Sequence, residues 1–107
     1  MSQKEIITKL QQYIQGLNNN GISIDKAYLY GSYARNEATE ESDIDVMLLS
    51  KLFDKNFDNI AGKIWTLSKD YDILIEPYMV GTNKFQTDEY SPIFEIVRRE
   101  GIEIKAL

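Results

Sequence analysis

Residues 31–50 read GSYARNEATEESDIDVMLLS, and this stretch decides the fold. Two aspartates, Asp43 and Asp45, are separated by one residue at the start of the apolar run Val46–Leu49. Side chains alternate between the two faces of a strand, so both carboxylates would share one face, with Cα atoms roughly 6.6 Å apart. Two such anions beside apolar side chains repel each other. The stretch therefore predicts that a cation binds between them.

A glycine and a serine open the same stretch. Gly31 and Ser32 follow the strand-like residues 27–30 and precede residues 33–38, which favour a short helix. Glycine lets a ligand approach the backbone closely, and a helix N-terminus offers free N–H groups to phosphate oxygens. Alone, this pair is more often a turn, and paired aspartates are more often a solvated strand start. Their order and spacing together predict phosphoryl or nucleotidyl transfer with divalent metal ions.

Composition narrows the chemistry further. The chain has 107 residues, 43% hydrophobic and 27% charged, which predicts a single domain over residues 1–107. It contains no cysteine and no histidine, so only hard oxygen ligands remain for a metal. The net charge of −5 predicts that the protein does not bind nucleic acid directly, because such binding normally needs a basic surface. We see no apolar run of membrane-spanning length and no signal-peptide pattern, and we expect a cytoplasmic protein.

The remaining pattern predicts alternating helices and strands. Ser2 and Glu5 form a capping-box pattern that begins a helix, which residues 18–21 end. Later segments are a strand at 43–50, a helix at about 54–69, a strand at 71–80 that Pro77 interrupts, a helix from Pro92 to Glu100 and a strand at 102–105. The expected fold class is α+β, a mixed sheet of about four strands flanked by helices.

The stretch resembles the signature of the nucleotidyltransferase superfamily that includes DNA polymerase beta, and most closely its minimal nucleotidyltransferases. The family pattern is Gly-Ser-x-Ala-Arg-Gly-x-Ala, a short spacer and Ser-Asp-Ile-Asp before apolar residues. The matching positions are Gly31, Ser32, Ala34, Arg35, Ala38, Ser42, Asp43, Ile44 and Asp45. Asn36 departs from the family glycine, but asparagine tolerates left-handed backbone geometry well.

The resemblance implies a complete site. Asp43 and Asp45 would hold two Mg²⁺ ions, with Mn²⁺ possible, and ATP would be the substrate. A third carboxylate is expected on a neighbouring strand, and we assign it to Asp72, as catalytic residue and metal ligand. Glu76 shares its face by alternation but would lie about 13 Å further along, so we expect it at the rim. The nucleotide would contact Gly31, Ser32, Arg35 and Ser42, although Arg35 could instead brace the loop.

The resemblance also implies a partner. Minimal nucleotidyltransferases pair with all-helical HEPN toxins and act as antitoxins by placing AMP on a tyrosine of the toxin. Two alternatives stay open: a module that binds nucleotide or partner without turnover, and a small-molecule nucleotidyltransferase working as a homodimer. The acceptor, the base preference and the oligomeric state do not follow from the sequence.

Overall fold

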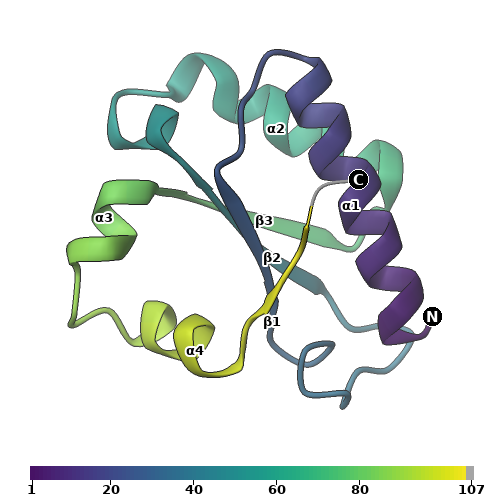
Figure 1. Cartoon of the computed structure of the whole chain (residues 1–107). Helices are drawn as coiled ribbons and strands as arrows, with labels where there is room; N and C mark the ends of the chain where they lie inside the picture. Colours follow the sequence, from purple (N-terminus) through teal and green to yellow (C-terminus); the bar gives the residue numbers. More distant parts are fainter. Residues whose placement is uncertain (106–107) are drawn as a thin grey trace.

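The computed structural model describes residues 1–105, in which helices flank a four-stranded sheet (Figure 1). The elements in chain order are α1 (Gln3–Asn19), β1 (Lys26–Tyr30), β2 (Ile44–Ser50), the short 3-10 helix η1 (Lys51–Asp54), α2 (Asp58–Tyr71), β3 (Ile75–Gly81), α3 (Thr82–Thr87), α4 (Pro92–Glu100) and β4 (Ile102–Glu103). The expected mixed α+β sheet is confirmed.

The strand order brings the ends of three strands together at one end of the sheet. The order is β3-β2-β1-β4, with β1 antiparallel to β2 and β2 parallel to β3. The parallel pair requires a crossover connection, and α2 provides it. As a result, the last residue of β1 lies beside the first residues of β2 and β3.

Two helical layers cover the two faces of the sheet. Figure 1 shows α1 and α2 on one side and α3 and α4 on the other. Alternation along β2 sends Ile44, Val46 and Leu48 into the larger core below α1 and α2. Met47 and Leu49 enter the smaller core below α3 and α4. Asp45 therefore belongs to the α3/α4 face.

The helix ends agree with the sequence at three places. Ser2 caps α1 with the reciprocal Glu5 bond of a capping box. Gly21, with φ of +79°, lies just beyond the end of α1. Pro92 begins α4, and Gly101 follows its last residue.

Five segments differ from the prediction. Residues 33–36 form turns and residues 37–38 have no regular structure, because Asn36 adopts φ of +61° and ends the helical course. Helix α2 begins at Asp58 rather than near residue 54, since Asp54 accepts hydrogen bonds from the backbone N–H groups that begin α3. Helix α3 was not predicted, and β4 is shorter than residues 102–105. Strand β3 begins at Ile75 rather than at residue 71, which bears on the site.

Across residues 1–105, no helix combines the length and the apolar character needed to cross a membrane.

One buried hydrogen bond joins the two helices of the larger layer. The Tyr13 hydroxyl donates to the Ile64 carbonyl at 2.8 Å, and burial raises the pKa of this phenol. We expect Tyr13→Phe to lower the free energy of unfolding by about 1 kcal/mol in a urea titration, because the buried Ile64 carbonyl loses this hydrogen-bond donor. Tyr90→Phe is the control, since Tyr90 is 91% exposed. Equal stability of the Tyr13 variant and the wild type would contradict this expectation.

Candidate active site

Three polar side chains form one row across the sheet. Tyr30 ends β1 and lies opposite Asp45 of β2, which in turn lies opposite Glu76 of β3. Partners in register point to the same face of a sheet, so all three side chains belong to the α3/α4 face. Asp43 precedes β2 by one residue and is exposed at the same end.

Negative charge accumulates around Asp45. Burial raises the pKa of its carboxyl group, and the nearby carboxylates of Asp43 and Glu76 raise it further. Arg35 acts in the opposite direction but does not cancel the effect. Burial, and then the nearby Asp45, Tyr78 and Glu76, raise the pKa of Tyr30 to about 12, so its hydroxyl stays protonated. We call the carboxylates Asp43, Asp45 and Glu76 the acidic row. Because Asp45 is half-buried among these anionic groups, a bound cation would be favourable here.

The backbone of the turn after β1 packs closely against the Asp45 side chain. Gly31 has φ of +77°, a backbone conformation that is strained for residues with a side chain. A Cβ atom at this position would lie 2.3 Å from the Asp45 Oδ2 atom. The backbone angle therefore favours glycine here, and any larger residue would also have to displace the Asp45 carboxylate. The Gly31–Ser32 turn is held directly against the acidic row.

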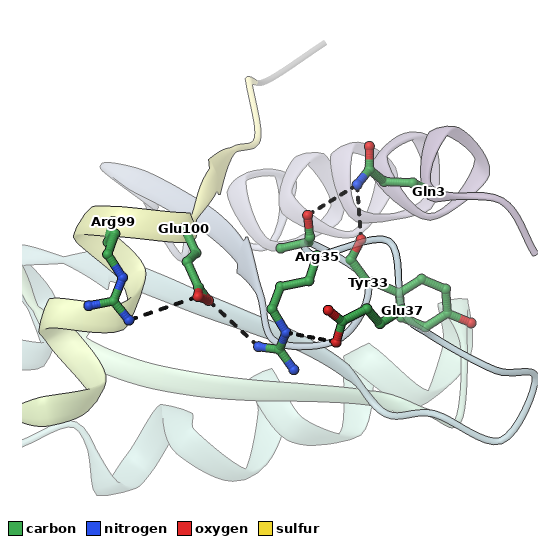
Figure 2. A network of polar contacts seen from close by, with 7 residues as sticks. Gln3, Tyr33, Arg35, Glu37, Arg99 and Glu100 are labelled. Atoms are coloured by element: carbon green, nitrogen blue, oxygen red, sulfur yellow. Dashed lines mark hydrogen bonds and ion pairs between the residues drawn. The ribbon is translucent and has the colours of Figure 1, made fainter.

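The loop that follows is fastened from two sides, as Figure 2 shows. From α1, the Gln3 side chain donates to the carbonyls of Tyr33 at 2.9 Å and Ala34 at 3.4 Å. From α4, Glu100 pairs with Arg35 at 3.6 Å. Glu37 also pairs with Arg35, at 3.3 Å. The guanidinium group, which also acts on Asp45, is thus held by the exposed Glu37 and the partly buried Glu100.

The two serines of the predicted nucleotide contacts lie in different surroundings. Ser32 belongs to the turn against Asp45, and its carbonyl accepts the Glu37 backbone N–H at 2.9 Å. The Ser42 hydroxyl instead accepts the Thr39 backbone N–H at 2.9 Å, so it closes its own loop. Ser32 thus belongs to the turn beside Asp45, whereas the Ser42 hydroxyl positions the chain ahead of Asp43.

The structure corrects the expected placement of Asp72. Asp72 follows the last residue of α2 and precedes β3, so it does not belong to a strand. Its carboxylate pairs with Lys9 of α1 at 3.0 Å and accepts the Leu74 backbone N–H at 2.9 Å. Because α1 covers the opposite face of the sheet from Asp45, Asp72 is not brought together with the acidic row.

Glu76 occupies the place that the prediction gave to Asp72. The predicted separation assumed an unbroken strand from residue 71, but the backbone turns at residues 72–75, where the Ile75 N–H bonds to the Asp72 carbonyl. Glu76 is the second residue of β3, opposite Asp45. A usable signal was present in the sequence, because Glu76 is a carboxylate inside an otherwise apolar strand.

The acidic row has the donor chemistry that Mg²⁺ or Mn²⁺ prefers, namely carboxylate oxygens. Among residues 1–105, no three acidic side chains converge closely enough to enclose an ion by themselves. Asp43 and Asp45 fit as a pair of protein ligands, with the remaining positions open to phosphate oxygens and water. This fits an ion that arrives with a nucleotide.

Comparisons with known proteins show the family and the fold. A family model described as "Nucleotidyltransferase domain" matches residues 5–94. A relative from Methanocaldococcus jannaschii, named "Putative protein adenylyltransferase MJ0141", is 37% identical over 75 residues, covering 68% of this chain and 74% of the relative.

Two solved structures share the fold. A toxin-antitoxin complex with AMP-PNP contains a chain with a TM-score of 0.61 and 22% identity, covering 91% of this chain and 73% of that one. A chain of the toxin-antitoxin complex MntA-HpeT, in a form with two aspartate-to-glutamate changes, has a TM-score of 0.59 and 19% identity, covering all of this chain and 75% of that one.

The Lys9–Asp72 pair predicts a pH-dependent contribution to stability. Burial alone would raise the pKa of Asp72, but the Leu74 N–H and the Lys9 ammonium outweigh it and lower the pKa. A lowered pKa stabilises the fold above the unfolded-state value of 3.8 and ceases to do so as the pH falls through the folded-state value. We expect Asp72→Asn to lower the free energy of unfolding by about 1 kcal/mol at pH 7, with the difference vanishing in acid.

Urea titrations at several pH values measure this difference. Asp70→Asn is the matched control, because Asp70 is an exposed aspartate in the last turn of α2, two residues before Asp72. A difference that persists unchanged well below pH 3 would contradict an ionic origin.

The acidic row predicts the opposite behaviour for Asp45. Without a divalent ion, Asp45→Asn should raise the thermal midpoint at pH 7, because it removes one of three neighbouring negative charges. Mg²⁺ with AMP-PNP should then raise the midpoint of the wild type more than that of the variant. Scanning calorimetry checks both shifts, and an Asp45 variant stabilised as strongly as the wild type by these ligands would contradict the site.

Proposed function

Because the chain is a nucleotidyltransferase that belongs to the family matched over residues 5–94, we propose that it is a protein adenylyltransferase. It moves AMP from ATP to a tyrosine hydroxyl of a partner protein. The observation that carries the proposal is the register of β2 and β3, which sets Glu76 opposite Asp45 with Asp43 at the same end. This arrangement supplies carboxylates for both the nucleotide side and the acceptor side of one phosphorus atom.

The relatives support the type of acceptor and the nucleotide. The M. jannaschii relative has protein adenylyltransferase in its name, and its identity of 37% covers 68% of this chain. One complex that shares the fold contains AMP-PNP, an analogue of ATP. The other carries changes at two aspartates one residue apart, the spacing of Asp43 and Asp45.

Each side chain of the row has a separate task in the proposed transfer. The Gly31–Ser32 turn presents backbone and hydroxyl groups to the β- and γ-phosphates, while Arg35 stands beside them. The acceptor oxygen attacks the α-phosphorus and forms a new P–O bond. The bond from the α-phosphorus to the bridging oxygen breaks, and pyrophosphate leaves. The acceptor proton passes to a carboxylate of the row, which we assign to Glu76 because β3 is the strand farthest from the turn.

The proposed reaction needs divalent ions, and Asp43 and Asp45 are the candidate ligands. When bound, Mg²⁺ or Mn²⁺ neutralises the triphosphate and polarises the phosphorus centre. Asp43 and Asp45 would hold these ions, and Asp72 is left to its pairing with Lys9. The proposal thus keeps two of the three carboxylates inferred from the sequence and exchanges the third for Glu76.

The proposed partner is a toxin, specifically an all-helical HEPN protein. The toxin-antitoxin complexes with the same fold support a toxin in general, and the family resemblance of residues 31–45 supports the HEPN class. The chain would act as the antitoxin by modifying and silencing its partner.

Transfer of label from α-labelled ATP tests the proposal. With Mg²⁺ and the product of the neighbouring gene, we expect AMP on a tyrosine of that product, located by mass spectrometry. Glu76→Gln should slow transfer at least about a hundredfold, because it removes the proton acceptor, while its thermal midpoint should not fall below that of the wild type, because it also removes one of the neighbouring negative charges. Asp72→Asn is the matched control and should transfer at the wild-type rate.

Three results would contradict the proposal in different ways. Absence of labelled protein in an intact complex would overturn transfer itself. Full activity of Glu76→Gln with loss in Asp72→Asn would restore Asp72 as the third carboxylate. Full silencing of the toxin by Asp43→Asn/Asp45→Asn would indicate that binding alone suffices.

A further inference from the structure

We propose that Tyr78 forms the surface on which the acceptor's aromatic ring stacks, so that it selects a tyrosine over an aliphatic hydroxyl. This inference rests on the proposed function and adds a residue that determines acceptor specificity. Three observations carry it: the position of Tyr78 beside Glu76, its exposure, and the direction from which the acceptor must come.

Tyr78 is the next residue after Glu76 on the same face of β3. Two residues along a strand correspond to roughly 6.6 Å between Cα atoms. Tyr78 lies opposite Met47, just as Glu76 lies opposite Asp45, so the two rows are adjacent. Met47 is fully buried in the smaller core. The ring of Tyr78 therefore borders the acidic row on one side and a packed apolar core on the other.

The Tyr78 ring is more exposed than its position on a helix-covered face of the sheet would lead one to expect. Tyr78 is 43% exposed, although its face of the sheet is the one covered by α3 and α4. Within the part of the chain that the structure describes, the aromatic pairs of this layer join Tyr28 to Phe85 and Phe85 to Phe94, and they leave Tyr78 out. An aromatic ring at a sheet edge beside reactive carboxylates offers a flat, rigid contact surface.

The order of the strands gives the direction of the acceptor. The Gly31–Ser32 turn follows β1, Asp45 lies on β2 and Glu76 on β3, the edge strand. A triphosphate held by the turn places its leaving group on the β1 side of the α-phosphorus. In-line attack requires the incoming oxygen on the opposite side, which is the β3 side. An acceptor over β3 reaches Glu76 with its hydroxyl and meets Tyr78 with its ring.

A tyrosine acceptor matches this pair of neighbours. Its hydroxyl would give its proton to Glu76, while its ring would lie offset on the Tyr78 ring. A serine acceptor offers the hydroxyl but no ring. Tyr78 should therefore affect the rate with a tyrosine acceptor and leave the rate with a serine acceptor nearly unchanged.

The test compares two forms of one partner. Wild type, Tyr78→Ala and Tyr78→Phe are assayed with α-labelled ATP and Mg²⁺ on the neighbouring gene's product, either intact or with its labelled tyrosine changed to serine. Trp65→Ala is the matched control, because Trp65 is 42% exposed but lies on α2 at the opposite face of the sheet. The binding constant for AMP-PNP and the thermal midpoint are measured for every variant.

We expect Tyr78→Ala to lower kcat/KM about three- to tenfold for the tyrosine acceptor only, the size of an aromatic pair interaction. Tyr78→Phe should restore the rate, and AMP-PNP binding should not change. Equal losses for both acceptors, or a loss that Tyr78→Phe does not restore, would overturn the stacking role. Wild-type rates in Tyr78→Ala would overturn this inference while the proposed function stands. A wild type that labels neither acceptor would overturn both.

Discussion

Burial of the hydrophobic core forces two carboxylates, Asp45 and Glu76, to lie opposite each other although they repel. Ile44 and Ile75 lie opposite each other in the register of β2 and β3, and both are fully buried against the α1/α2 layer. This apolar pair brings the next residues, Asp45 and Glu76, opposite each other on the other face. A slip of one residue would relieve the repulsion but would move Glu76 into the larger core, which costs far more. Hydrophobic burial therefore holds two anions together.

The conflict also explains the surroundings of the row. A bulky residue after β1 would separate the turn from Asp45, and Gly31 avoids this because its missing side chain leaves room for the carboxylate. The Arg35 guanidinium lies near Asp45, but Glu37 and Glu100 already pair with it. Its charge is shared among carboxylates and cannot compensate the whole row. The row therefore keeps an uncompensated negative charge that costs some stability, which supports the proposed binding of a divalent ion.

Much of this could be read from the sequence, and the reason for the one error at the site is local. The Gly31–Ser32 turn, the Asp43/Asp45 pair and the left-handed Asn36 all lie in one continuous segment, where spacing alone fixes their relation. The third carboxylate depends on how a crossover helix returns to the sheet. Counting alternation from Asp72 fails because a turn separates it from β3, and a strand period has no meaning across a turn. The start of α2 and the presence of α3 depend on Asp54, whose role is a long-range contact.

The two acidic sites of the chain differ in what balances their charge, and this difference separates stability from chemistry. Asp72 has an ammonium group at 3.0 Å and a backbone N–H at 2.9 Å, so its carboxylate is satisfied and its pKa is lowered. Asp45 is half-buried and has two carboxylates nearby, and these raise its pKa although the shared Arg35 acts in the opposite direction. A satisfied carboxylate gains little from a metal ion, since binding one would break existing contacts. An unsatisfied one gains attraction without losing a partner, and for that reason the row on β2 and β3 supports the proposed chemistry better than Asp72 does.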